Sequence, residues 1–146
     1  MGAIGLAALG FYAWVKAAWA LGSTIGIRDV AEWERVFGEL PDFERWLALE
    51  GTVVLALLGA ILLLLILADE RTPLGRGGWR RLIRGAGWIA AVPLGLYAVL
   101  ALVVTVAQVV SGEPSPLAPW VSFGVYLAFL AYAATLVIAN RVTARR

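Results

Sequence analysis

The longest uncharged stretch of the chain, residues 51–68, predicts a membrane span. The eighteen residues between Glu50 and Asp69 include no charged side chain. At a rise of about 1.5 Å per residue the stretch makes roughly 27 Å of helix, close to the ~30 Å thickness of the bilayer hydrocarbon. Further apolar stretches cover residues 4–21, 86–110 and 120–139. The pattern therefore predicts an all-α integral membrane protein, with a four-transmembrane-helix bundle as a single membrane domain over residues 1–146.

Two features of residues 86–110 predict how this span packs. Gly87, Ala91 and Gly95 recur every fourth residue, which gives a seam of small side chains that another helix can approach closely. Pro93 lacks a backbone donor and clashes with the carbonyl of residue 89, so we expect a kink there.

The one long hydrophilic segment, residues 23–50, carries seven acidic residues and three arginines. Asp29 and Glu32 have the spacing of a capping box, and Val30, Trp33 and Phe37 follow at helical spacing. We expect a short amphipathic helix here that ends near Gly38.

A second short helix is expected from Pro41, because proline suits the first helical position. Phe43, Trp46 and Leu47 share one face, so this helix can run on into the span at residue 51. Helix-surface ion pairs are predicted for Arg28–Glu32 and Asp42–Arg45, each contributing only ~0.2 to 0.5 kcal/mol.

The distribution of arginines predicts the orientation of the chain. Residues 69–85 and the tail from residue 141 hold eight arginines together, against three in residues 23–50 and none in 111–118. The positive-inside rule then places residues 69–85 and both termini in the cytoplasm, with the protein in the cytoplasmic (inner) membrane. Residues 23–50 and 111–118 lie outside.

Composition excludes several classes of chemistry. The chain is 62% hydrophobic and 15% charged, which is typical of polytopic membrane proteins. It contains no cysteine and no histidine, so thiol chemistry and the usual zinc and haem ligands are excluded, and we expect no cofactor and no metal site. The slight positive charge is explained by topology, so no nucleic-acid partner is expected.

Lys16 is the residue of most interest, because a charge within a span costs ~2 to 3 kcal/mol unless it is compensated. Three explanations stay open: the side chain snorkels to the headgroups, it pairs with Glu50, or it serves a substrate or ion. Gln108, on the third span, is a further candidate for an intramembrane polar site, although such residues more often bond neighbouring helices.

The basic run before the third span contains Arg80, Arg81 and Arg84. These side chains are candidates for binding anionic lipid headgroups, at about 1 kcal/mol each, although their role in topology is sufficient to account for them and the two roles are compatible. We find no catalytic motif, and the acidic residues of segment 23–50 alternate with arginines as on a solvated helix face.

Lys16, the pair Leu40-Pro41, and Leu49-Glu50-Gly51 followed by Gly59 occur in an order that resembles the DoxX-like and MauE-like small membrane proteins. The resemblance covers residues 10–66 and is carried by short motifs. It implies a four-helix bundle and an accessory role beside quinone-linked or thiol redox enzymes, although direct thiol chemistry is excluded without cysteine.

The leading hypothesis is therefore a non-catalytic accessory or assembly subunit that packs on a partner membrane protein or forms a homo-oligomer. The alternative is a small homo-oligomeric transporter or channel, with Lys16 and Gln108 lining the path. A third hypothesis, an intramembrane enzyme acting on lipid, requires acidic residues that converge, with Glu32, Glu39 and Glu50 as candidates.

Overall fold

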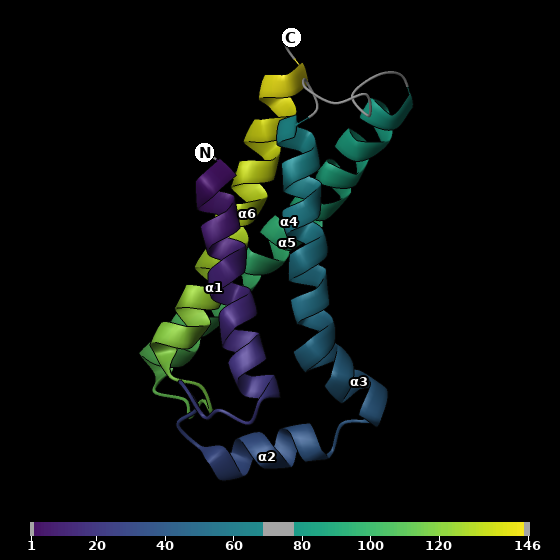
Figure 1. Cartoon of the computed structure of the whole chain (residues 1–146). Helices are drawn as coiled ribbons and strands as arrows, with labels where there is room; N and C mark the ends of the chain where they lie inside the picture. The colour runs from purple at the N-terminus through teal and green to yellow at the C-terminus, as the bar shows by residue number, and fades with distance from the viewer. Residues whose placement is uncertain (1, 69–77, 145–146) are drawn as a thin grey trace.

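Four long helices dominate the structure, a computed structural model that describes residues 2–68 and 78–144. They are α1 (Gly2–Ala20), α4 (Thr52–Ala68), α5 (Gly78–Ser111) and α6 (Pro119–Ala144), and they run alongside one another (Figure 1). Each long apolar stretch predicted from the sequence corresponds to one helix that is long and apolar enough to cross a membrane. The prediction of a four-helix bundle is confirmed at this level.

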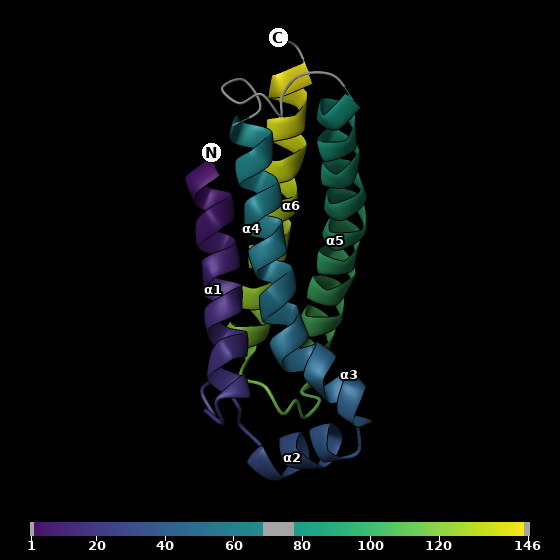
Figure 2. The same cartoon turned by 45° about the vertical axis from the view of Figure 1, so that its right-hand side comes forward.

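Helix α6 is the most buried of the four, since it packs against α5 on one side and α1 on the other. Helix α4 packs mainly on α1 and meets α5 much less closely. Both termini lie toward the same end of the bundle, here named the terminal end (Figures 1 and 2). The short helix α2 (Val30–Gly38) lies across the opposite end, here named the α2 end.

Two helices extend beyond the predicted spans at the terminal end. Helix α5 begins at Gly78 rather than at residue 86, so Arg80, Arg81 and Arg84 lie on a helix and not in a loop. Helix α6 continues past residue 139 to Ala144. The span prediction stopped at charged residues, whereas arginine is a good helix former and lets the backbone continue beyond the apolar region.

The segment before α4 forms one continuous helical rod with it. Helix α3 (Asp42–Trp46) passes through a π-helical turn, Leu47–Gly51, into α4. The expectation that the second short helix runs on into the span is therefore confirmed, but the π-turn was not expected. Helix α5 likewise runs unbroken through Pro93.

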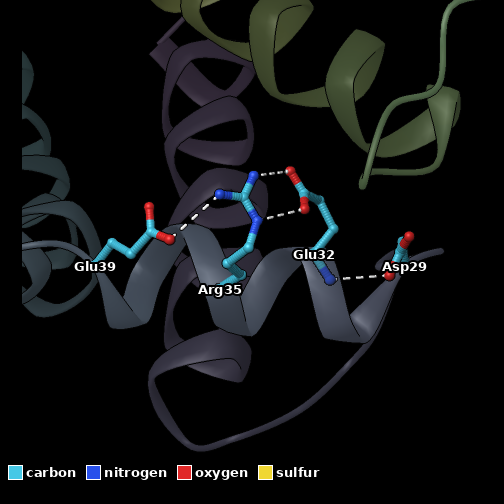
Figure 3. A network of polar contacts seen from close by, with 4 residues as sticks. All are labelled: Asp29, Glu32, Arg35 and Glu39. Carbon is cyan, nitrogen blue, oxygen red and sulfur yellow. Dashed lines mark hydrogen bonds and ion pairs between the residues drawn. The ribbon is translucent and has the colours of Figure 1, made fainter.

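The polar contacts of α2 agree in part with the prediction. Asp29 Oδ1 accepts from the backbone N–H of Glu32 at 2.9 Å, so the predicted N-cap is confirmed (Figure 3). The predicted Arg28–Glu32 pair is wrong, because Arg35, one turn further on, binds the Glu32 carboxylate at 2.6 Å and also reaches Glu39. At α3 the expected Arg45–Asp42 pair forms at 2.6 Å.

The small-residue seam of α5 packs inside the bundle. A Cβ at Gly87 would lie 2.5 Å from Asn140 Nδ2 on α6, and one at Gly95 would lie 3.6 Å from Ala133 Cβ. Ala91, between them, is buried. The missing side chains therefore allow the close contact of α5 with α6.

At the α2 end, the loop after α1 is tied to the loop between α5 and α6. Ile27 and Leu117 form an antiparallel bridge, and Ala118 donates its N–H to the Gly26 carbonyl at 2.7 Å. Gly26 has φ of +73°, and a Cβ there would overlap Val121. Glycine is therefore required on both counts, and the contact fixes the position from which α2 begins.

Candidate functional site

Lys16 lies near the end of α1, at the α2 end of the bundle. Its ammonium donates to the backbone carbonyl of Ala48 at 3.0 Å and lies 5.1 Å from the centre of the Trp19 ring. The ring in turn donates through Nε1 to the Ile25 carbonyl and packs on Trp33 of α2. Charge on Lys16 is thus balanced by a carbonyl dipole and the face of an aromatic ring.

The carbonyl that receives Lys16 belongs to the π-turn. A π-turn shifts the backbone hydrogen bonds from i→i+4 to i→i+5, and such turns occur frequently at functional sites. The hydroxyl of Thr52 also lies 3.2 Å from the Ala48 oxygen and 2.6 Å from that of Leu49. Two side-chain donors, Lys16 and Thr52, therefore meet at one backbone oxygen.

Glu50, the other partner considered for Lys16, forms no ion pair with it among the described residues. Its side chain is exposed and lies beside a surface hollow formed with Asp42, Arg45, Trp46 and Leu49. Because Lys16 donates to a main-chain oxygen, no pattern of side chains in the sequence predicts this hydrogen bond.

Around Lys16 lies a small cavity of about 110 Å³ with mainly aromatic walls. Its aromatic lining residues come from three helices and are Tyr12, Trp19, Tyr97, Tyr126 and Phe129. The rings of Tyr12 and Phe129 contact each other, with centroids 4.5 Å apart. The sequence analysis missed this aromatic set, because the residues are far apart in the chain.

Gln108 lies in a different and larger cavity, of about 560 Å³, at the α2 end. The charged and polar residues lining it are Arg28, Asp29, Glu32, Thr105, Glu113, Ser115 and Ser122. Leu117 and Ser122 line both this cavity and the one around Lys16, so the two adjoin. The structure therefore places Lys16 and Gln108 in adjoining cavities and not in one.

A third hollow is an apolar groove of about 380 Å³ where α4 and α5 pack loosely. Five leucines of α1, α4 and α5 line it: Leu9, Leu55, Leu58, Leu62 and Leu94. Tyr12 and Thr52 also line it, as do Phe129 and Tyr132 of α6. The hydroxyl of Tyr132 donates to the Gly59 carbonyl at 2.7 Å and links α6 to α4.

No known protein family matches the chain, and no curated protein and no solved structure is significantly similar to it. The resemblance of residues 10–66 to DoxX-like proteins therefore stays a prediction.

Toward the terminal end the interior is closed by apolar packing. Leu63, Ile66 and Leu136 are almost fully buried there. Among residues 2–68 and 78–144, no cluster of acidic side chains has the arrangement of a metal site. The cavities near Lys16 thus lie toward the α2 end, and mainly apolar side chains fill the bundle beyond them, with Thr135 and Asn140 as buried polar residues.

The acidic residues proposed for lipid chemistry do not converge. Glu32 and Glu39 both bind Arg35 on the exposed surface of α2, whereas Glu50 lies on the π-turn. The hydrogen bond from Arg35 holds the pKa of Glu32 below its ordinary value, and Glu32 raises the pKa of Arg35 in return. A carboxylate held ionised in this way is a poor general acid.

The basic residues proposed for lipid binding lie on the first turns of α5, at the terminal end. Arg81 is exposed, while Arg80 and Arg84 are half-buried. Arg141, near the end of α6, is also exposed. Positive charge therefore collects at the terminal end and negative charge at the α2 end.

Proposed function

We propose that the protein is a non-catalytic accessory or assembly subunit, which docks within a membrane on a partner protein or on a second copy of itself. An open stripe of small residues on α1 carries the proposal. Ala3, Ala7 and Gly10 lie on an exposed face, and a Cβ at Gly10 would meet no atom within 4 Å. Small residues let a second helix approach closely where no hydrophobic force acts between helices.

Two other small-residue positions, Gly5 and Gly87, do not serve this purpose, because the bundle itself packs against them. A Cβ at Gly5 would lie 2.8 Å from Leu63 and 2.9 Å from Thr135. The seam at Gly87 faces α6 in the same way. We therefore assign docking through small residues to the open face of α1.

The α2 end provides the second part of the proposed docking surface. We place this end outside the cytoplasm and the arginine-rich terminal end inside it, in the cytoplasmic membrane. Helices α2 and α3 then lie at the membrane surface as amphipathic helices. Trp33 packs on Trp19 and on Phe37, at centroid distances of 4.8 and 4.0 Å, so α2 presents its charged face in a fixed position.

Substitution of Gly10 by leucine tests the docking surface. The bundle has room for this side chain, so we expect Gly10→Leu to fold normally but to lose the higher-mass complex seen by native mass spectrometry in mild detergent. Gly85→Leu is the matched control, because Gly85 is also helical and open. A wild-type protein that is monomeric both in native membranes after cross-linking and in mild detergent would exclude the proposal.

Single cysteines test the proposed orientation, since the natural chain has none. A membrane-impermeant maleimide applied to intact cells should label Glu44→Cys and should not label Arg81→Cys. The reverse pattern would invert the orientation and overturn the assignment of the docking surface to the outside.

The second candidate is a small transporter, and the adjoining cavities near Gln108 and Lys16 favour it. A solute entering from the α2 end would meet polar walls first and then the Lys16 ammonium. Purified protein in liposomes should then give a flux of ions or small solutes that Lys16→Met abolishes. Flux equal to that of empty vesicles would remove this candidate.

A further inference from the structure

The Lys16 ammonium has hydrogen-bonding capacity that the protein does not use. An ammonium carries three donors, and Lys16 directs one to the Ala48 carbonyl. Among the described residues no carboxylate forms an ion pair with it, and its remaining contact is the face of Trp19. The ammonium also lines a cavity of about 110 Å³. Two donors are therefore available to an acceptor that comes from outside the chain.

The same ammonium does not itself line the apolar groove, but it lies close to residues that do. Lys16 and Thr52 both bind the Ala48 oxygen, and Thr52 is a lining residue of the groove between α4 and α5. Tyr12 lines both the groove and the Lys16 cavity. A molecule that lies in the groove therefore has one end within reach of Lys16.

The α4 side of this groove changes from polar to apolar, and the Tyr132 hydroxyl and Gly59 carbonyl farther along it bond to each other. Thr52 and Tyr12 line the end toward α2, and the α4 wall then continues through Leu55 and Leu58 to Leu62. On the α5 side the wall is formed by Ala90 and Leu94. From Thr52 to Leu62 the groove is roughly 15 Å long, at ~1.5 Å per residue. A polar end followed by an extended apolar wall suits an amphipathic chain.

The location of the groove restricts what can enter it. Its walls belong to four helices that are long and apolar enough to span a membrane. An opening between two such helices faces the hydrocarbon, so its occupant must dissolve in the bilayer. The size of the Lys16 cavity restricts the polar end further, since about 110 Å³ equals the volume of only three or four waters at ~30 Å³ each.

We propose that the protein binds a long-chain fatty acid, with the carboxylate at the Lys16 ammonium and the hydrocarbon chain in the groove between α4 and α5. A carboxylate forms short, charge-assisted hydrogen bonds to an ammonium and compensates its charge inside the membrane. A phospholipid fits less well, because its phosphodiester is larger than a carboxylate and the cavity at Lys16 has a volume of only about 110 Å³. The site is independent of whether α1 docks on a partner.

Binding is measured with the full chain in uncharged detergent by isothermal titration, using hexadecanoate, hexadecanol and a single-chain lysophospholipid. We expect hexadecanoate to bind roughly 10- to 100-fold more tightly than hexadecanol, the factor for a hydrogen bond to a charged group. Equal affinity for acid and alcohol would overturn the carboxylate assignment without any variant. Tighter binding of the lysophospholipid would assign the groove to a phosphate-bearing lipid instead.

Two variants locate the ligand. Lys16→Met should reduce hexadecanoate affinity by the same roughly 10- to 100-fold. The pKa of a ¹³C-labelled hexadecanoate carboxyl group should be lowered when it is bound to the wild type and should not be lowered when it is bound to Lys16→Met. Ala90→Phe fills the groove and should weaken the binding of both hexadecanoate and hexadecanol. Ala107→Phe, on an exposed face of the same helix, should leave the binding of both unchanged. If the two phenylalanine variants bind alike, the chain does not lie in the groove and the proposal fails.

Discussion

The contact between α5 and α6 at Gly87 allows a quantitative test of the packing. A Cβ at this position would lie 2.5 Å from Asn140 Nδ2 and 2.9 Å from Ile66 Cδ1. Both neighbours are almost completely buried, at 2% and 1% exposed, so neither can turn out to solvent or lipid. The methyl group in Gly87→Ala therefore has to displace packed atoms from two other helices.

The matched variant is Gly85→Ala, two residues earlier on the same helix, where a Cβ would meet nothing within 4 Å. Replacing glycine by alanine in a helix gains up to about 1 kcal/mol of propensity, and both variants share this gain. Only Gly87→Ala also suffers overpacking, which costs typically ~1 to 3 kcal/mol. The difference between the two free energies of unfolding isolates the steric effect.

We expect Gly85→Ala to be as stable as the wild type or more stable, and Gly87→Ala to be roughly 1 to 3 kcal/mol less stable than Gly85→Ala. The measurement is reversible unfolding of the full chain in mixed micelles with increasing dodecyl sulfate, followed by circular dichroism. A difference within about 0.5 kcal/mol, the usual range for a surface change, would refute the close approach of α5 to α6 at this point.

Three further predictions concern single contacts. Tyr132→Phe removes the hydrogen bond from α6 to α4 and should destabilise the bundle by ~0.6 kcal/mol, and at most by ~1.7. Thr135→Val, whose hydroxyl bonds within α6, should change micelle unfolding less. Gly26→Ala should cost at least ~1 to 2 kcal/mol, because φ is +73°, and faster amide exchange in the neighbouring loop would reveal the loosened contact. The pKa of Glu32 is lowered by its bond to Arg35. The contribution of the ionised Glu32 carboxylate to folding stability is therefore complete at neutral pH and is lost only as the pH falls through that lowered pKa. An NMR titration should show the pKa of Glu32 returning to the ordinary value in Arg35→Gln, and an unchanged titration would contradict the pairing.

The sequence determined those features that depend on local physical chemistry. An uncharged run as long as the hydrocarbon is thick has to form a helix, because a bilayer offers no other partner for backbone N–H and C=O groups. The number of long helices follows from that, as does the cap at Asp29, which needs only a carboxylate close to the first free N–H groups. The packing of Gly87 and Gly95 against α6 was also foreseeable as a close contact, because small side chains recur on one face.

The environment of Lys16 was decided only by the tertiary structure. Its partner is the main-chain oxygen of Ala48, and every residue carries such an oxygen, so side-chain patterns could offer only Glu50, two positions away, as a pairing partner. The groove between α4 and α5 exists because α6 takes up most of the packing surface of α5. How far two helices separate depends on what a third helix contacts, and that relation links residues too distant in sequence for any local pattern to encode.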